Sequence, residues 1–409
     1  MCEEPKMRVL HLCDSLNPAG VGGYESYLHY LSEELTRLEH TSCIVSQAQK
    51  RDSPARVRRK HYTIHFLPGN HLEARKWQFL ALPESDRELA MPRLFHPADL
   101  EENVDALVPQ LGQLIERFSP DVIHAHSTYV VFNRVLFRMV DSRSLGKTPL
   151  VLTIHGLPKP LVLPDGTRTT DYEQLERFCP FETVIAVSNT VLDSLEKFLR
   201  PRHGDLKLEK LYAGVDLRSF RPAARPVKRW DLAFLGRLEQ TKGVDLFPDM
   251  LLQLRQRFPH LRMVLTGAGS YRDPLLKELS GKGVDDMVDY LGVVPATRVP
   301  SIINQSKIFI YASRQEPFGL SVVEAMACGI PPVTSNIHGP SEIVTDGRDG
   351  VTVTPGSLTE LVTAVGNLLI DNSLRERLGL NALRTVETRF DMHEHARKLV
   401  SIYRSLLKK

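Results

Sequence analysis

Two glutamates, Glu316 and Glu324, are the acidic residues of this sequence whose surroundings best suit the binding of a polar ligand. They belong to the segment SRQEPFGLSVVEAMACG, which overlaps the end of a strand pattern, IFIYAS. We expect a helix to begin near Gly319, so that Glu316 lies in the preceding turn and Glu324 in the helix. Pro317 and Gly319 favour an irregular backbone with free amides at the helix N-terminus, where a phosphate is well accommodated. A carboxylate there would instead accept hydrogen bonds from sugar or ribose hydroxyls.

The simpler interpretation makes Glu316 a helix cap and Glu324 a solvated helix residue. The neighbours of Glu324 argue against it, because they are apolar: Val322, Val323, Ala325, Met326 and Ala327. A charge on a helix that is apolar almost all round is costly unless it is paired or bound to a ligand. The pattern therefore favours a binding site.

Two cations, Arg237 and Lys242, lie in the segment GRLEQTKG, which follows the first strand pattern of the second half. They are separated by a turn, so both side chains could reach one anion. Arginine offers a fork for phosphate oxygens, and lysine offers a mobile point charge. The alternative is an exposed loop whose cations are only solvated.

In the first half, three features follow or end strand patterns. The loop GVGG, residues 20–23, lacks the spacing of a dinucleotide-binding fingerprint, but its glycines allow close approach to a phosphate or sugar. His124 and His126 share one face of a strand by alternation, so geometry does not choose between them. His155 ends the next strand pattern and is a further candidate to line a cleft.

The elements that must position these residues are short apolar runs alternating with helical patterns, which is typical of parallel sheets covered on both faces. The expected strands are Met7–Cys13, Ser42–Ser46, Val122–His126, Leu150–His155, Thr183–Val187, Asp231–Leu235, Arg262–Thr266, Val288–Leu291, Ile308–Tyr311 and Pro332–Thr334. Helices are expected at Leu246–Phe258, Leu358–Leu369 and Met392–Leu407. We predict an α/β fold of two Rossmann-like, doubly wound parallel-sheet domains facing across a cleft. Ligands of such sheets bind beyond the carboxyl ends of strands.

The predicted domains are residues 1–215 and 216–390, joined near the proline-containing segment Ala213–Pro226. Residues 391–409 form a C-terminal helix whose amphipathic pattern allows it to pack back on the first domain.

The composition excludes several classes of protein. The chain of 409 residues is 42% hydrophobic and 25% charged, which fits a large buried core and not a disordered chain. A net charge of +3 gives no sign of nucleic-acid binding. The five cysteines are scattered and form no zinc or disulfide pattern. We find neither a secretory signal nor an apolar run long enough to cross a membrane, so we expect a cytoplasmic protein.

The segment Gln49–Lys76 is rich in Lys and Arg, which would suit an anionic membrane surface or an anionic acceptor. A solvated loop face is the alternative. Trp77, Phe79 and Phe95 lie in the irregular stretch that follows, and such long loops often carry function. Peripheral contact with the inner face of a membrane is therefore one expectation.

The chain resembles the family-4 retaining glycosyltransferases, which have the two-domain GT-B fold. Their E-x7-E signature is similar to the segment with Glu316 and Glu324. Other segments match in the expected order: MRVLHLCDSLNPAGVGGYESYLHYLSEEL, DVIHAHS, TIHG, AVSN, YAGVDLRSF, FLGRLEQTKGVD, LTGAGS and GPSEIVTDGRDGV. The resemblance implies an N-terminal acceptor-binding domain and a C-terminal nucleotide-sugar-binding domain.

The resemblance also implies roles for single residues. Glu316 would bind hydroxyls of the donor sugar, and Glu324 those of the ribose. Arg237 and Lys242 would bind the diphosphate and stabilise it as it leaves, and His126 would contact the donor sugar. The remaining residues that the resemblance assigns to donor binding are Gly22, Gly23, Val293, Phe318, Gly319 and Leu320. It implies a nucleotide diphosphate sugar as donor, most often a UDP-sugar, and no cofactor. The sequence has no DxD-type metal motif in a suitable turn, so we expect no obligatory metal.

Three residues depart from the family pattern. Ala213 stands in place of the usual Asn, and Pro332 stands where Val is more frequent. His338 replaces the first glycine of a usual Gly-Gly pair, which would reshape a loop near the donor.

Two other functions fit a similar site. A sugar-nucleotide epimerase or hydrolase of the same fold would act on the donor without an acceptor. A non-catalytic nucleotide-sugar-binding subunit would be expected to lose some of the four charged residues Arg237, Lys242, Glu316 and Glu324, all of which are present.

Overall fold

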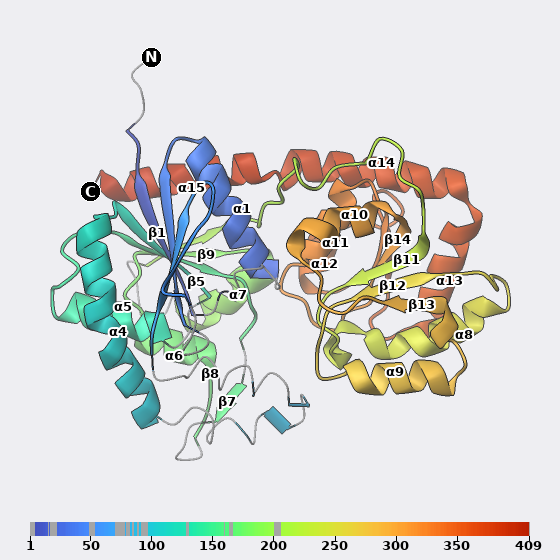
Figure 1. The fold of residues 1–409 in the computed structure, drawn as a ribbon, viewed down its shortest axis with the longest axis horizontal. Coiled ribbons are helices and arrows are strands. Elements are labelled where there is room, and N and C mark those ends of the chain that lie inside the picture. Colours follow the sequence, from blue (N-terminus) through green and yellow to red (C-terminus); the bar gives the residue numbers. More distant parts are fainter. Residues whose placement is uncertain are drawn as a thin grey trace. The chain divides into compact units, whose positions relative to one another are not determined.

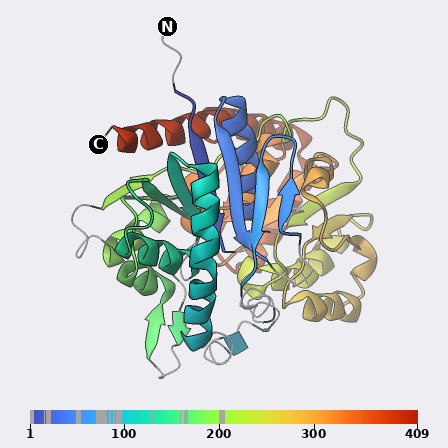
Figure 2. The same cartoon turned by 60° about the vertical axis from the view of Figure 1, so that its left-hand side comes forward.

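The computed structural model describes residues 5–14, 16, 23–48, 54–69, 78, 82–83, 86–87, 90, 97–127, 131–158, 160–162, 167–199 and 206–408. The chain forms two compact units (Figures 1 and 2). The N-terminal unit comprises residues 1–18, 28–212 and 395–409, and the C-terminal unit comprises residues 19–27 and 213–394.

The N-terminal unit contains a sheet of eight strands in the order β10-β9-β6-β5-β1-β2-β4-β3. Its strands are β1 (Arg8–Cys13), β2 (Thr41–Gln47), β3 (Arg56–Arg58), β4 (Thr63–Leu67), β5 (Val122–His126), β6 (Leu150–Ile154), β9 (Thr183–Ala186) and β10 (Lys207–Lys210). Only β3 pairs antiparallel among these described strands. From β1 the chain adds β2 on one side and β5 on the other, so the topological switch point lies between β1 and β5.

Helices cover this sheet, and a short hairpin lies outside it. The helices are α1 (Gly23–Arg37), α4 (Pro97–Phe118), α5 (Val131–Asp141), α6 (Asp171–Arg177), α7 (Asn189–Phe198) and α15 (Met392–Leu407), and the hairpin is β7 (Pro160–Val162) with β8 (Arg168–Thr170). Most of α15 belongs to this unit although it ends the chain. Its Tyr403 is fully buried, and the hydroxyl lies 2.6 Å from His124 Nδ1 on β5.

The C-terminal unit contains six strands, all parallel, in the order β13-β12-β11-β14-β15-β16. They are β11 (Trp230–Leu235), β12 (Met263–Thr266), β13 (Val288–Tyr290), β14 (Ser306–Tyr311), β15 (Pro332–Ser335) and β16 (Val351–Val353). Their apolar residues are almost completely buried, which explains the continuous apolar runs of the sequence. The switch point lies between β11 and β14.

Helices also surround this second sheet. They are α8 (Phe247–Arg255), α9 (Arg272–Gly281), α10 (Val299–Asn304), α11 (Leu320–Ala327), α12 (His338–Ile343), α13 (Leu358–Ile370) and α14 (Asn372–Arg389), with 3-10 turns η1 (Gln240–Lys242), η2 (Val244–Leu246), η3 (Asp285–Met287) and η4 (Ala296–Arg298). The predicted fold class, two parallel-sheet α/β domains, is confirmed. No helix in the described part of the chain is both long enough and apolar enough to cross a membrane.

Candidate active site

Two loops meet at the switch point of the C-terminal unit, one after β11 and one after β14. The amide of Arg314 donates to Thr241 O at 2.8 Å, and Ser313 Oγ donates to the same oxygen at 3.0 Å. Gly243 has φ 72°, and a Cβ there would lie 2.0 Å from the carbonyl oxygen of Ala312. Because only glycine fits this approach, the loop with the two cations is held against the loop with Glu316.

Glu316 is buried in the turn after β14, as the sequence predicts. Its Oε2 accepts hydrogen bonds from Lys242 Nζ at 2.7 Å and from the Tyr311 hydroxyl. Its Oε1 lies 3.4 Å from the amide nitrogen of Phe318. Burial alone would raise the pKa of Glu316, but the Lys242 charge and these hydrogen bonds outweigh it and hold the pKa below its ordinary value. Glu316 is therefore an ionised carboxylate fixed in one orientation.

The two cations have separate carboxylate partners. Lys242 is buried against Glu316, whereas Arg237 Nη1 lies 2.8 Å from Glu239 Oε2. The Arg237 side chain is 55% exposed, so its guanidinium also faces solvent. Arg237 and Lys242 therefore do not pair with the same carboxylate. Both lie on the loop at the switch point, where a bound anion would be close to the carboxyl ends of the strands.

Helix α11 begins one residue after a glycine in the left-handed region, since Gly319 has φ 106°. The amides of Gly319, Leu320 and Ser321 have no hydrogen-bond partner among the described residues. Val322 and Val323 donate to the Gly319 carbonyl and complete the first turn. The unpartnered amides and the positive end of the helix dipole therefore suit a phosphate group.

Glu324 is buried within α11 and has no side-chain partner among the described residues. Burial raises the pKa of Glu324 to about 8. A buried carboxyl group without a partner destabilises the fold, so its presence is explained best by a ligand that donates hydrogen bonds to it.

The start of α12, at His338, touches the turn that carries Glu316. The amide of Gly339 donates to Glu316 O at 3.1 Å, and a Cβ on Gly339 would lie 2.3 Å from Phe318 Cα. His338 has φ 35°, which is unfavourable for a residue with a side chain. This explains why two glycines would fit here. Val293 lies in the loop after β13 and is 49% exposed.

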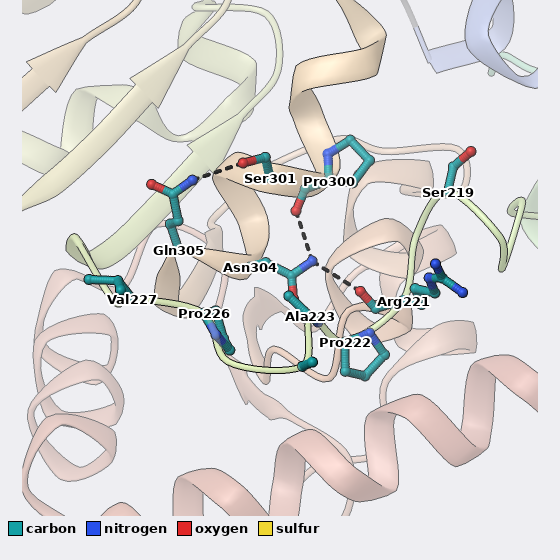
Figure 3. A pocket seen from close by; sticks show the side chains of 11 residues that line it. Ser219, Arg221, Pro222, Ala223, Pro226, Val227, Pro300, Ser301, Asn304 and Gln305 are labelled. Atoms are coloured by element: carbon teal, nitrogen blue, oxygen red, sulfur yellow. Dashed lines mark hydrogen bonds between the residues drawn. The ribbon is translucent and has the colours of Figure 1, made fainter.

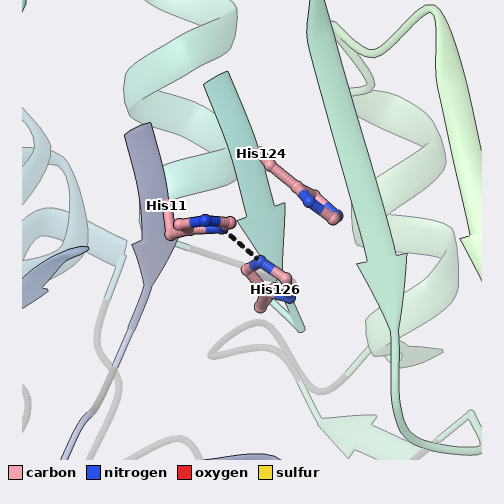
Figure 4. Close-up of side chains that lie close together, drawn as sticks. All are labelled: His11, His124 and His126. Carbon is pink, nitrogen blue, oxygen red and sulfur yellow. Dashed lines mark hydrogen bonds between the residues drawn. The ribbon is translucent and has the colours of Figure 1, made fainter. Parts of the chain in front are cut away.

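The N-terminal unit brings histidines together at its own switch point (Figure 4). His11 on β1 and His126 on β5 face one another, with His11 Nδ1 at 3.1 Å from His126 Nε2. His124 is turned toward Thr153, with Nε2 at 2.8 Å from its hydroxyl. Burial lowers the pKa of His11 to about 3 and the pKa values of His124 and His126 well below the ordinary value. The histidines are thus neutral, and His126 is at the end of β5 as predicted.

The rings of His11, His124 and His126 offer nitrogens within 4.8 Å of one another, a spacing that could admit a metal ion. However, both nitrogens of His124 already lie at hydrogen-bond distance from the hydroxyls of Tyr403 and Thr153. His11 and His126 bond to each other. Hydrogen bonding accounts for the arrangement, and we assign no metal to it.

An open hollow of about 730 Å³ lies elsewhere on the C-terminal unit, between the segment after Ser219 and α10 (Figure 3). Asn304 fills part of it and bonds to the carbonyl oxygens of Arg221 and Pro300. The hollow adjoins Gln305, just before β14, and so lies at the amino ends of the strands. Ligands of parallel sheets bind at the opposite ends, so we do not place the active site here.

Not every residue that the sequence singles out lies within the described part of the chain. Gly22, Trp77, Phe79 and Phe95 lie outside the described residues, and Gly23 is the first residue of α1. His155 follows β6 and is half-buried, and desolvation lowers the pKa of its ring to about 3. Sequence reasoning missed Tyr311 and Glu239. Glu239 could have been found from its place between the two cations, but Tyr311 ends an apolar strand pattern and gives no such signal.

The fold and these loops define an α/β protein of two Rossmann-like domains, with charged groups and unpartnered amides among its described residues beyond the strands of the C-terminal sheet. Two family models match it, Glycosyltransferase Family 4 over residues 21–219 and Glycosyl transferases group 1 over residues 217–385. The chain belongs to the family-4, group 1 glycosyltransferases, and it is a glycosyltransferase with the GT-B fold.

Individual relatives agree with this family. Glycogen synthase of Mycobacterium tuberculosis is 26% identical over 97% of this chain and 94% of its own length. A GDP-mannose-dependent alpha-(1-6)-phosphatidylinositol monomannoside mannosyltransferase of Mycolicibacterium smegmatis is 32% identical over 42% of this chain and 50% of its own length. Among solved structures, Anabaena HepE in complex with UDP and glucose has a TM-score of 0.70 at 20% identity, covering 98% of this chain and 100% of that chain.

Proposed function

We propose that this glycosyltransferase moves a sugar from a nucleoside diphosphate donor to a hydroxyl of an acceptor and retains the configuration at the anomeric carbon. The observation that carries the proposal is the buried pair of Lys242 and Glu316 at the switch point, next to the unpartnered amides that begin α11. A carboxylate, a cation and free amides at one point match the hydroxyls and phosphates of a sugar nucleotide.

Each part of the donor has a candidate partner. Glu324 accepts hydrogen bonds from the ribose hydroxyls, which would supply the partners that its buried carboxyl group lacks. The amides of Gly319 and Leu320 bind the diphosphate. Glu316 accepts a hydrogen bond from a hydroxyl of the sugar. Phe318 shapes the turn between these groups, and backbone groups at Val293 contact the base.

Negative charge must be stabilised on the leaving diphosphate while positive charge develops on the sugar. Arg237 has an exposed guanidinium that can turn to the diphosphate, and Lys242 lies between that anion and Glu316. In a front-face reaction, a leaving phosphate oxygen takes the proton of the acceptor hydroxyl, so no separate base is needed. These groups make a metal unnecessary, and we expect turnover to persist in the presence of a chelator.

We assign His126 of the N-terminal unit to the donor sugar, and we assign the glycine loop that includes Gly22 and Gly23 to the donor as well. His126 ends β5 and is neutral, so its ring can give or accept one hydrogen bond without adding charge. The acceptor would bind to this unit. Exposed Arg56, Arg58 and Lys60 offer a basic surface for an anionic acceptor or membrane.

UDP is our first candidate for the donor nucleotide. HepE is complexed with UDP and glucose, whereas the name of the mycobacterial mannosyltransferase specifies GDP-mannose. A thermal-shift screen of UDP, GDP and ADP, each free and as its sugar, distinguishes these possibilities because selective binding stabilises the folded protein. If none of them stabilises the protein, the proposed function is wrong.

Arg237→Ala tests the role of the leaving-group cation. We expect kcat to fall by about 10²–10³-fold with a small change in KM, since the contact strengthens in the transition state. Arg262→Ala is the matched control, because Arg262 is also a half-exposed arginine paired with a carboxylate, that of Asp289, but lies before β12. Unchanged kcat in the Arg237 variant would exclude the role.

The rival functions separate in a reaction without acceptor. An epimerase would convert the sugar nucleotide stoichiometrically to its epimer, and a hydrolase would release free sugar rapidly. A non-catalytic subunit would bind the donor and leave it unchanged with every acceptor. Release of nucleoside diphosphate that requires an acceptor supports the transferase.

A further inference from the structure

The two carboxylate oxygens of Glu316 have unequal surroundings. Oε2 accepts hydrogen bonds from both Lys242 Nζ and the Tyr311 hydroxyl, whereas Oε1 has, among the described residues, only the distant amide of Phe318 at 3.4 Å. Lys242 and Tyr311 therefore occupy one side of the carboxylate. The side with Oε1 keeps the capacity to accept a further hydrogen bond.

Tyr311 is held rigidly enough to determine this orientation. It is the last residue of β14 and is buried, with its ring stacked between those of Phe234 and Phe309 at centroid distances of 6.2 and 6.3 Å. Lys242 Nζ lies 5.9 Å from the centroid of the same ring. The phenol cannot leave Glu316 without disturbing the packing of its own ring against those of Phe234 and Phe309.

The protonation of Tyr311 is also fixed. Burial, and then the negative charge of Glu316, raise the pKa of Tyr311 well above its ordinary value. The phenol is therefore protonated at neutral pH, and its O–H donates a hydrogen bond to the carboxylate.

We propose that Tyr311 is a positioning residue that, together with Lys242, engages Oε2 of Glu316 and turns Oε1 toward the donor sugar. This rests on the proposed function, in which Glu316 holds a sugar hydroxyl. Glu316 then accepts a hydrogen bond from that hydroxyl in one direction. The sugar part of the donor is therefore recognised separately from the nucleotide part.

The experiment compares the affinities of a nucleoside diphosphate and of its sugar by calorimetry, with UDP and UDP-glucose and with GDP and GDP-mannose as probes. The ratio of the two affinities reports the contact with the sugar, whereas the affinity for the free nucleotide reports Glu324 and the phosphate site. In Tyr311→Phe, we expect the ratio to fall by roughly tenfold while the affinity for the free nucleotide is unchanged.

The pH dependence gives a second measurement that a merely structural tyrosine would not change. A hydrogen bond to the ionised carboxylate lowers the pKa of Glu316, so its removal raises that pKa. The pH below which the sugar contact is lost should therefore rise by about one unit in Tyr311→Phe. Glu316→Gln should abolish this pH dependence.

Ser306→Ala is the control, because Ser306 begins the same strand and its buried hydroxyl donates to Ile302 O at 3.0 Å. It should leave both affinities unchanged. A Tyr311→Phe variant that loses affinity for nucleotide and sugar alike, or that keeps the wild-type ratio while Glu316→Gln loses it, overturns the positioning role and leaves the proposed function standing. Wild-type protein that binds neither of these pairs, nor ADP and its sugar, removes both proposals.

Discussion

The carboxyl group of Glu324 is partly protonated near neutral pH, because burial raises its pKa to about 8. Ribose hydroxyls donate most strongly to the ionised carboxylate, so donor binding should release the proton. We expect the affinity for UDP, or for GDP if that is the nucleotide bound, to rise as the pH rises toward 8 and to become constant above it. Calorimetry at pH 7 in two buffers of different ionisation enthalpy measures the released proton.

Glu324→Gln provides the control for this measurement. The folded pKa of Glu324 lies above the ordinary value of 4.5, so the free protein loses stability as the pH rises from 4.5 through 8. The glutamine variant should bind nucleotide more weakly, release no proton and resist unfolding at pH 8 better than the wild type. Proton release that persists in this variant would refute the assignment of Glu324.

The pair of Lys242 and Glu316 allows stability and activity to be separated. Lys242→Met leaves a buried carboxylate without its cation, which should cost about 3–5 kcal/mol of unfolding free energy. The double variant with Glu316→Gln removes the charge and should recover most of this stability, but it should remain inactive. Urea unfolding and acceptor-dependent turnover test both parts. Equal stability of the single and double variants would show that the pair is not buried as described.

Part of this residue-level description follows from the sequence alone. Glu316 and Glu324 are conspicuous because they adjoin a helix that is otherwise apolar, and burial of a charge there demands an explanation. Tyr311 is not conspicuous, since an aromatic residue at the end of an apolar strand is expected in any core. Only the three-dimensional structure shows that the hydroxyl of Tyr311 donates to Glu316.

At the scale of elements, the sequence predicts strands best where both faces are buried. The continuous apolar runs of β5 and β14 identify them to within two residues. The strands β10 and β16 were not predicted, because they have few residues and mixed polarity at the sheet edges. The edge strand β3 carries Arg56 and Arg58, and charges on an edge also prevent pairing with other chains, which gives its basic residues a structural purpose.

Helix α15 should depend on one buried hydroxyl for part of its attachment to the N-terminal unit. Tyr403→Phe leaves His124 Nδ1 without that hydrogen bond in a fully buried site. We expect a loss of about 1–3 kcal/mol, seen as faster hydrogen exchange of the amides in β5 and α15. Tyr212→Phe removes an exposed hydroxyl near Lys210 and should have little effect. Unchanged exchange in the Tyr403 variant would mean that packing alone holds the helix.

At the scale of the whole molecule, the two units exchange segments along the chain. Residues 395–409 complete the N-terminal unit, and residues 19–27 belong to the C-terminal unit. The amphipathic pattern of the last helix allows such packing but does not require it, because the exchange depends on contacts such as that of His395 Nδ1 with Tyr212 O at 2.7 Å, between residues far apart in sequence. The strand-and-helix pattern does predict that there are two parallel-sheet domains.

Acid should unfold the two units separately. The N-terminal unit contains four buried histidines and a half-buried one, and desolvation lowers the pKa of each: His11, His124, His126 and His395, and the half-buried His155. The unfolded chain takes up protons below pH 6.5 and the folded unit does not, so each histidine removes up to about 1.4 kcal/mol of stability per pH unit as the pH falls from 6.5 toward the folded pKa.

The stability of the C-terminal unit should rise, not fall, as the pH falls from 7 to 5. The pKa of Glu316 lies below its ordinary value of 4.5, so its contribution is lost only in stronger acid, and protonation of Glu324 adds stability in this range. Calorimetry at pH 5 should therefore show an early transition of the N-terminal unit and a later one of the C-terminal unit. Hydrogen exchange with mass spectrometry assigns the transitions, with β1 and β5 reporting one unit and β11 and β14 the other. Earlier loss of protection in β11 and β14 would show that the buried histidines do not govern acid stability.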